Sequence, residues 1–231
     1  MAWDPLGTIG SAYWISGGQW AGKSTVARIL ARRYGLTAYH YDYQANHAHY
    51  DRRLARLVRE GQPARDPDPE EMWLAHSPAE MAAEVLEGFA MDFEWVLDDL
   101  RALIPGRPIL AEGWGIRPEF VHDLGGAERM LVMVPTDEFR EYQLCTLDRA
   151  RTFHAAVTDP DQAQRNRLER DRLVTADCVA SARRLGIPVL EVDGSRSAEF
   201  VADIVAAQFG LDPHSDGARQ TSRVDTVQSG E

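Results

Sequence analysis

The sequence predicts an α/β fold in which helices cover a mostly parallel sheet. Two observations lead to this class. Short apolar runs, which are typical of buried strands, alternate along the chain with stretches of helical periodicity. A glycine-rich loop joins the first apolar run, at 12–15, to the first helical stretch, at 25–34. With 231 residues, the chain is long enough to bury a full core as one domain.

Five apolar runs are predicted to be the strands, at residues 12–15, 36–41, 108–111, 129–134 and 187–192. Helical spacing is found at 25–34, 45–60, 78–103, from 137 onward, at 160–185 and at 198–210. Residues 61–69 are too rich in proline for either kind of element and are predicted to form a loop. The folded domain therefore spans 1–210. From 211 to 231 the chain is polar and lacks periodicity, which predicts a disordered tail.

Local signals mark the starts of three of these helices. Ser77 precedes Pro78 and is followed three residues later by Glu80, which predicts a capping box. Thr136 and Ser197 stand where a side chain can accept a hydrogen bond from the first turn of a helix. These caps fix the starts of the helices more closely than periodicity alone.

The glycine-rich loop has the G-x-x-x-x-G-K-[ST] pattern of a phosphate-binding P-loop. Its residues are Gly17, Gly18, Gln19, Trp20, Ala21, Gly22, Lys23 and Ser24. Glycines let backbone N–H groups curl around a polyphosphate, the lysine reaches the β- and γ-phosphates, and the hydroxyl ligates Mg²⁺. The start of the following helix adds its positive dipole end. We expect this loop, together with Thr25, to bind a nucleoside triphosphate.

Composition and charge argue against several other classes of protein and cellular location. A net charge of −11 argues against nucleic-acid binding, which needs a basic surface. No apolar run approaches the roughly 18 residues of a membrane span, and the N-terminus lacks the profile of a signal peptide. Cys145 and Cys178 form no metal or redox spacing. The expected location is therefore cytoplasmic, without a membrane or nucleic-acid partner; a homodimer stays open.

From residue 10 to 210 the chain resembles the nucleoside monophosphate kinase-like group of P-loop kinases. That group includes shikimate, gluconate and nucleoside kinases and chloramphenicol phosphotransferase. The resemblance rests on the P-loop, an acid after strand two, a helical insert and an arginine-bearing lid. It implies a three-layer sandwich with five parallel strands in the order 2-3-1-4-5, an acceptor-binding insert at about 43–104, and a lid at about 148–170. ATP, or another triphosphate, and Mg²⁺ are the implied cofactors.

Other P-loop classes fit less well. The chain contains no N/TKxD motif of GTPases. Residues 15–19 imitate the LSGGQ sequence of ABC transporter ATPases, but they overlap the P-loop and cannot serve both roles. AAA-type ATPases expect paired acids after a hydrophobic strand and a helical domain at the C-terminus, and neither is found.

Two carboxylates are candidates for catalysis beside Lys23. Asp42, predicted to end strand two, would face the crevice where such sheets bind ligands. In the kinases that the chain resembles, an acid there is proposed to accept the proton of the substrate hydroxyl; a helix-capping aspartate is the alternative. Glu112 ends strand three and would hold Mg²⁺, together with Ser24, or act as the base itself.

Arginines are candidates for stabilising the transferred phosphate. Residues 148–151 resemble the D-x-x-R pattern of some lids, which assigns this role to Arg151, with Arg149, Arg167 and Arg170 as further candidates. Arg196, after the last strand, resembles a residue that borders adenine and would stack on the base.

The insert is expected to bind the acceptor, a small molecule. The aromatic candidates for its pocket are Trp73, Phe89, Phe93, Trp95 and Trp114, although core packing is the stronger expectation for the three on the predicted helix. An anionic acceptor would find cations at Arg52, Arg53 and Arg56. His40, His47 and His49 are expected at the surface or at the rim of the pocket, because their spacing does not suit a metal site.

The leading functional hypothesis is an ATP-dependent kinase that phosphorylates a hydroxyl of a nucleoside, a sugar-like metabolite or an antibiotic. Two alternatives are carried with it. A nucleoside monophosphate kinase would have a phosphate acceptor and less need of a carboxylate base. A regulatory module would use triphosphate hydrolysis as a switch and would phosphorylate no small molecule.

Overall fold

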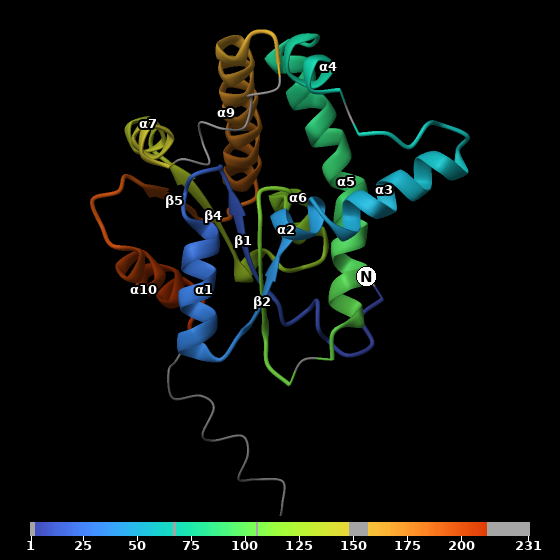
Figure 1. The fold of residues 1–231 in the computed structure, drawn as a ribbon. Coiled ribbons are helices and arrows are strands. Elements are labelled where there is room, and N and C mark those ends of the chain that lie inside the picture. The colour runs from blue at the N-terminus through green and yellow to red at the C-terminus, as the bar shows by residue number, and fades with distance from the viewer. Residues whose placement is uncertain (1–2, 67, 105, 148–156, 212–231) are drawn as a thin grey trace, which may run out of the picture.

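Five parallel strands form the sheet at the centre of the molecule (Figure 1). The structure is a computed structural model that describes residues 3–66, 68–104, 106–147 and 157–211. The strands are β1 (Tyr13–Gly17), β2 (Thr37–His40), β3 (Ile109–Glu112), β4 (Met130–Pro135) and β5 (Val189–Val192). Their order is β2-β3-β1-β4-β5, which confirms the predicted topology and the α/β class.

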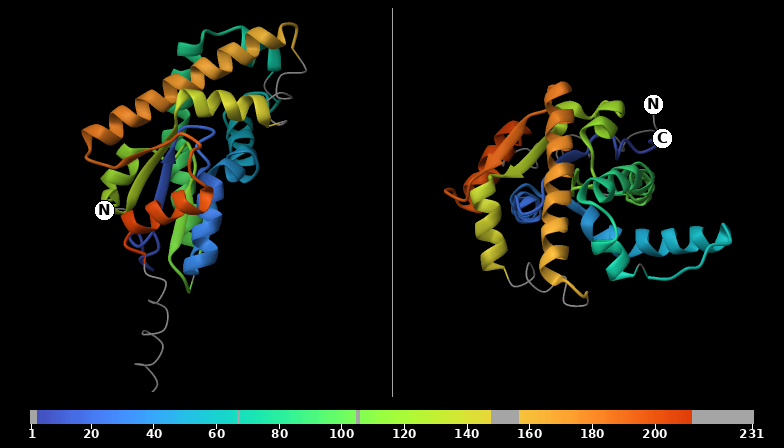
Figure 2. Two further views of the ribbon diagram at one scale, coloured as in Figure 1. Left: turned by 90° about the vertical axis from the view of Figure 1, so that its left-hand side faces the viewer. Right: turned by 90° about the horizontal axis from the view of Figure 1, so that it is seen from above.

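Helices pack on both faces of the sheet and make a three-layer sandwich (Figure 2). One face is covered by α1 (Lys23–Tyr34) and α10 (Ala198–Gln208), with α7 (Asp137–Thr146) beside them. The other face is covered by α5 (Pro78–Ala102), α6 (Pro118–Asp123) and α9 (Pro160–Arg184). Because both faces are buried, the strands are almost continuously apolar: every residue of β3 and β4 is buried.

The capping predictions are confirmed in the structure. Ser77 accepts a hydrogen bond from the backbone of Glu80, whose carboxylate accepts one from the backbone of Ser77, so the capping box is complete. Thr136 and Ser197 cap α7 and α10 in the same way through their hydroxyls. Asp159 supplies the corresponding cap for α9, one residue before the predicted Pro160.

The insert region differs from its prediction in two respects. The helix expected at 45–60 is α3 (Ala48–Arg59), and a separate short helix, α2 (Tyr41–Ala45), precedes it where the predicted strand two ends. The backbone leaves the helical region between them at His47, with φ −131° and ψ −100°. A further short helix, α4 (Pro69–Leu74), starts in the proline-rich segment at the side-chain cap of Asp68. Figure 2 shows α3 projecting away from the sheet.

Smaller differences concern the connections. Helix α6 and the single turn of 3-10 helix η1 (Ala127–Arg129) lie between β3 and β4, where no element was predicted. Leu211, the first residue of the predicted tail, packs against the core beside α10. Residues 212–231 lie outside the described residues. In the part of the chain that the structure describes, we find no helix that is both long and apolar enough to cross a membrane.

Candidate active site

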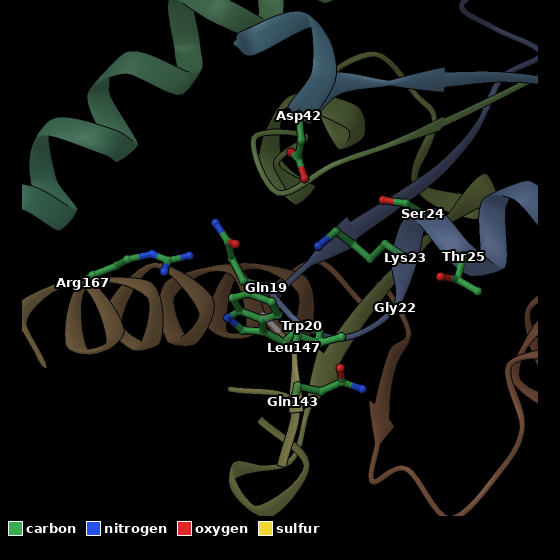
Figure 3. A pocket seen from close by; sticks show the side chains of 10 residues that line it. All are labelled: Gln19, Trp20, Gly22, Lys23, Ser24, Thr25, Asp42, Gln143, Leu147 and Arg167. Atoms are coloured by element: carbon green, nitrogen blue, oxygen red, sulfur yellow. The ribbon is translucent and has the colours of Figure 1, made fainter. Parts of the chain in front are cut away.

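A cavity of about 500 Å³ lies at the carboxyl ends of the strands, where β1 turns into α1 (Figure 3). Its wall combines residues of the P-loop, of α2, of the end of α7 and of α9: Gln19, Trp20, Gly22, Lys23, Ser24, Thr25, Asp42, Gln143, Leu147 and Arg167. The P-loop, the residue just before the predicted insert and Arg167 of the predicted lid therefore line one cavity. This is where open α/β sheets bind their ligands.

The P-loop is held tightly against the neighbouring strand. The backbone N–H of Gly18 donates to the carbonyl of Met133 in β4. Gly17 has φ +119°, and a Cβ at this position would lie 2.0 Å from that same carbonyl oxygen. Only glycine fits here, both for the backbone angle and for the space. The first glycine of the motif thus fixes how the loop leaves the sheet.

Lys23 lies buried at the start of α1 and lines the cavity. Its ammonium group donates to the carbonyl of Gly18 at 2.7 Å, which places the charge within the curl of the loop. It is also the only lysine in the sequence. Arginine supplies every other basic side chain, apart from the histidines.

The start of α1 is open to the cavity. Gly22 occupies the capping position with a left-handed backbone, φ +79°. Ser24 is exposed on the cavity wall and Thr25 is half-buried beside it. Unpaired N–H groups and the positive dipole end make such a helix start suitable for phosphate, and an exposed hydroxyl is a hard oxygen ligand for Mg²⁺.

Asp42 also lines the cavity, but it stands in the first turn of α2 and not at the end of β2. Its carboxylate Oδ1 accepts a hydrogen bond of 3.2 Å from the backbone N–H of Trp114. Burial raises the pKa of Asp42, and the nearby charge of Glu112 raises it further, whereas Lys23 and the Trp114 hydrogen bond lower it. The net effect is a pKa above the ordinary aspartate value, so this carboxylate is a stronger base than an exposed one.

Glu112 is fully buried at the end of β3 and is not among the residues that line the cavity. Its Oε1 is hydrogen-bonded to Nδ1 of His40, the residue paired with it on β2. This bond is the main reason why the pKa of His40 is raised. Its other oxygen, Oε2, is buried without a hydrogen-bond partner. The carboxylate therefore lies at the predicted strand end, buried beside His40, and its role at the site stays a prediction.

One of the candidate lid arginines reaches the cavity. Arg167 is buried on α9, and its guanidinium lies 5.7 Å from the centre of the Trp20 ring. Burial lowers its pKa, while the neighbouring Asp171 raises it. Figure 3 shows the side chain extending from α9 toward the middle of the site. Arg149 and Arg151 lie outside the described residues.

Arg170 is placed differently from Arg167. It donates two hydrogen bonds to Oδ1 of Asp171, and its guanidinium lies 4.8 Å from the ring centre of Trp73 and 5.5 Å from that of Trp114. It thus ties α9 to α4 and to the loop after β3. We expect Arg170 to hold the walls of the site together and not to contact phosphate.

The structure pairs the three candidate arginines of the insert with carboxylates. Arg52 pairs with Asp99, Arg53 with the buried Asp92, and Arg56 with Glu60. These ion pairs connect α3 to α5 or stay within α3, so the three cations already have anionic partners. The sequence could not show this, because it depends on how α3 crosses α5.

The histidines and aromatic residues divide between core and surface. His49 is fully buried and bonded to Asp99 at 2.8 Å, contrary to the expected surface position, whereas His47 stacks on Tyr43 at the surface. Phe89 and Phe93 belong to the core, as expected. Trp95, half-buried, lines a separate groove on α3.

Arg196 does not line this cavity. Its guanidinium lies 5.0 Å from the ring centre of Phe200, beside a separate small pocket of about 130 Å³ between β5 and α10.

Two residues that line the main cavity, Gln143 and Leu147, were not among the predicted site residues. Both stand near the end of α7, where nothing in the local pattern distinguishes them from other residues of the helix.

Comparisons with known proteins add little to this geometry. No family model matches the chain, and no curated protein matches it. Among solved structures, the chain is similar to shikimate kinase from Aquifex aeolicus, with 16% identity and a TM-score of 0.40, over 85% of this chain and 94% of that one. We draw nothing about activity from a similarity at this level.

Proposed function

We propose that the protein is a phosphotransferase that moves the γ-phosphoryl group of ATP to a hydroxyl of a small molecule. One observation carries the proposal: a single cavity joins a P-loop lysine, a carboxylate of raised pKa and a buried arginine, namely Lys23, Asp42 and Arg167. Phosphoryl transfer needs these three kinds of group, for cradling the phosphates, receiving the acceptor proton and stabilising the transferred charge.

On the donor side, the loop and the start of α1 would hold the triphosphate, with Lys23 at its β- and γ-phosphates. The exposed hydroxyl of Ser24 is suited to Mg²⁺, which neutralises phosphate charge when it is bound with the nucleotide. Glu112 is less suited to this task, because it is buried and bonded to His40. We assign it instead to raising the pKa of Asp42.

On the acceptor side, Asp42 would take the hydroxyl proton as the oxygen attacks the γ-phosphorus. Arg167 would meet the charge on the transferred group. Arginine suits this position because it stays charged even where burial lowers its pKa, and because its planar fork matches phosphate oxygens.

A hydroxyl acceptor fits better than the phosphate of a nucleoside monophosphate. A phosphate acceptor would need cations on the insert, but Arg52, Arg53 and Arg56 are paired with carboxylates. It would also have no need of Asp42 as a base. A regulatory NTPase would leave Asp42 and the insert without a role. The cytoplasmic location stays a prediction.

The donor half of the proposal is tested by acylation with an acyl-phosphate derivative of ATP. Because Lys23 is the only lysine, acylation of the side chain can be located by the mass of a single peptide. We expect labelling of Lys23 that excess ATP suppresses. Labelling that is indifferent to ATP would remove the basis for a triphosphate site.

The acceptor half is tested by incubating the protein, ATP and Mg²⁺ with a pool of small metabolites, nucleosides and antibiotics. We expect one class of hydroxyl compound to gain the mass of one phosphoryl group. If ATP is consumed at the same rate with and without every compound, while Lys23 is still labelled, the hydrolysing module is the better description.

A further inference from the structure

The phosphate loop contains a bulky residue in a backbone conformation that normally belongs to glycine. Trp20 has φ +69°, and among the described residues it is the only non-glycine residue with positive φ. For a large side chain this conformation is strained. A glycine would adopt the same backbone freely. The reason for a tryptophan here must therefore lie in what its ring does.

The ring of Trp20 lines the cavity beneath the guanidinium of Arg167, at 5.7 Å. The two residues belong to different elements, the P-loop and α9, so this contact joins the phosphate loop to the helix. On its other side, Nε of Arg167 lies 4.0 Å from Oδ2 of the buried Asp171. The guanidinium therefore contacts both the tryptophan ring of the P-loop and an aspartate one turn along its own helix.

We propose that Trp20 is a positioning residue that holds Arg167 over the phosphate end of the cavity, so that the loop that binds the triphosphate also places the arginine of α9. The inference rests on the proposed function in one respect, that the cavity binds a triphosphate. It does not depend on which acceptor is used, or on whether one is used.

The choice of residue types supports this coupling. A guanidinium is weakly hydrated and stacks well on an aromatic face, and the attraction strengthens when both groups are shielded from water. Arg167 is buried and Trp20 is half-buried. Because Trp20 is part of the phosphate loop, any adjustment of the loop to its ligand shifts the face on which Arg167 rests. Arg167 should then favour the nucleotide that carries a γ-phosphate.

The experiment measures the affinities of ADP and of the imido analogue of ATP, with Mg²⁺, by calorimetry. The ratio of the two affinities reports recognition of the γ-phosphate without any turnover. We expect Trp20→Phe, which keeps an aromatic face, to retain most of the wild-type preference for the triphosphate. Trp20→Leu keeps apolar bulk without the face, and we expect the preference to fall about threefold to tenfold. Trp20→Gly should lose as much, although its backbone is unstrained.

The decisive comparison combines Trp20→Leu with Arg167→Lys. If the tryptophan acts through the arginine, the double variant should lose no more preference than Arg167→Lys alone. Losses that multiply, or a Trp20→Leu protein with the wild-type preference, would overturn the inference. Thermal unfolding of each variant checks that the fold is retained, and Trp20→Phe gives a second reading if Trp20→Leu is unstable.

The outcomes also separate this inference from the proposed function. The wild type could prefer the triphosphate, and Trp20→Leu could lose that preference, although the protein phosphorylates no hydroxyl compound. That result would support the role of Trp20 and overturn the proposed transferase activity. A wild-type protein that binds neither nucleotide overturns both.

Discussion

At the scale of single residues, Asp42 combines access to the cavity with surroundings that raise its pKa. It faces the cavity, yet it is surrounded closely enough for burial to raise its pKa. A general base works best when its pKa approaches the working pH. Lys23 and the backbone N–H of Trp114 oppose the shift and keep the carboxylate ionisable.

Replacing Asp42 by Asn should remove the base and leave the phosphate cradle intact. We expect kcat for the identified acceptor to fall by about a hundredfold to ten-thousandfold, the usual contribution of a general base. The affinity for ATP should change little. Asp51→Asn, at an exposed carboxylate on α3, is the matched control and should behave like the wild type. Near-normal turnover in Asp42→Asn would point to a phosphate acceptor.

The raised pKa of Asp42 also predicts the pH profile. Turnover needs the deprotonated carboxylate, so activity should disappear as pH falls through the pKa of Asp42, which lies above the ordinary aspartate value of 3.8. Glu112→Gln removes a negative charge that raises the pKa of Asp42. His40 lowers the same pKa, but by less than Glu112 raises it. The acidic limb of kcat should therefore move to lower pH. A limb that moves upward, or stays in place, would contradict the assignment of Glu112.

At the scale of elements, buried carboxylates on α5 attach the end of β2 and the insert to the core. The hydroxyl of Tyr41 donates to Oδ2 of Asp92 at 2.9 Å, and Arg53 of α3 pairs with the same carboxylate. The hydroxyl of Tyr39 donates in the same way to Asp99 at 2.8 Å. These contacts place α2, and with it Asp42, beside the P-loop.

Removing the hydroxyl of Tyr41 should loosen this attachment. Tyr41→Phe leaves the buried Asp92 with one partner fewer, and we expect a loss of about 1.5–3 kcal/mol in the free energy of unfolding, measured in urea. Tyr43→Phe is the control, because Tyr43 is exposed and should show no loss. An equal effect of the two substitutions would mean that the hydrogen bond to Asp92 contributes nothing.

The same pair of proteins predicts a trend in alkaline solution. Burial raises the pKa of Tyr41 above its ordinary value of 10.0, so the unfolded chain loses this proton first. The stability that Tyr41 contributes is therefore complete below pH 10 and is lost as pH rises beyond it. The difference in stability between the wild type and Tyr41→Phe should shrink there. A difference that widens would show that the phenol ionises inside the fold.

Elements with long patterns or strong caps could be predicted from the sequence, and short ones could not. The sheet order followed from the resemblance, and α5 followed from its capping box at Ser77. Helices α4 and α6 have six residues each, too few for helical periodicity to show. The sequence did not predict the break at His47 or the burial of His49, two residues further on, against Asp99.

The candidate site shows the same division. Motif spacing identified the P-loop residues, and Lys23, Ser24 and Asp42 do line one cavity. It could not single out Arg167 among the arginines of α9, because which of them faces inward depends on how the helix packs. Nor could it reveal the ion pairs of Arg52 and Arg53, which join helices far apart in sequence, or the backbone of Trp20.

At the scale of the whole molecule, ligand binding and unfolding should be linked through the two cysteines. Cys145 is exposed, whereas Cys178, a residue of α9, is buried in the core. A thiol reagent should therefore modify one cysteine at once and the second only when the fold opens. ATP at a hundred times its dissociation constant should slow the second modification by about a hundredfold.

Lys23→Ala supplies the control for this experiment, because it removes the cation from the phosphate site. In that variant ATP should give little or no protection of Cys178, whereas the rate without ATP should stay near that of the wild type. Protection by ATP that survives the substitution would place the nucleotide elsewhere on the molecule. Mass spectrometry of the two cysteine peptides follows both rates.

The solitary lysine has a consequence for spectroscopy. A chain grown with ¹⁵N-labelled lysine carries the isotope at a single residue, Lys23, inside the curl of the phosphate loop. The magnetic resonance of that ammonium nitrogen needs no assignment and has no background from other side chains. Titrating nucleotides, Mg²⁺ or acceptors while following this one signal would show how each of them changes the field at the centre of the site.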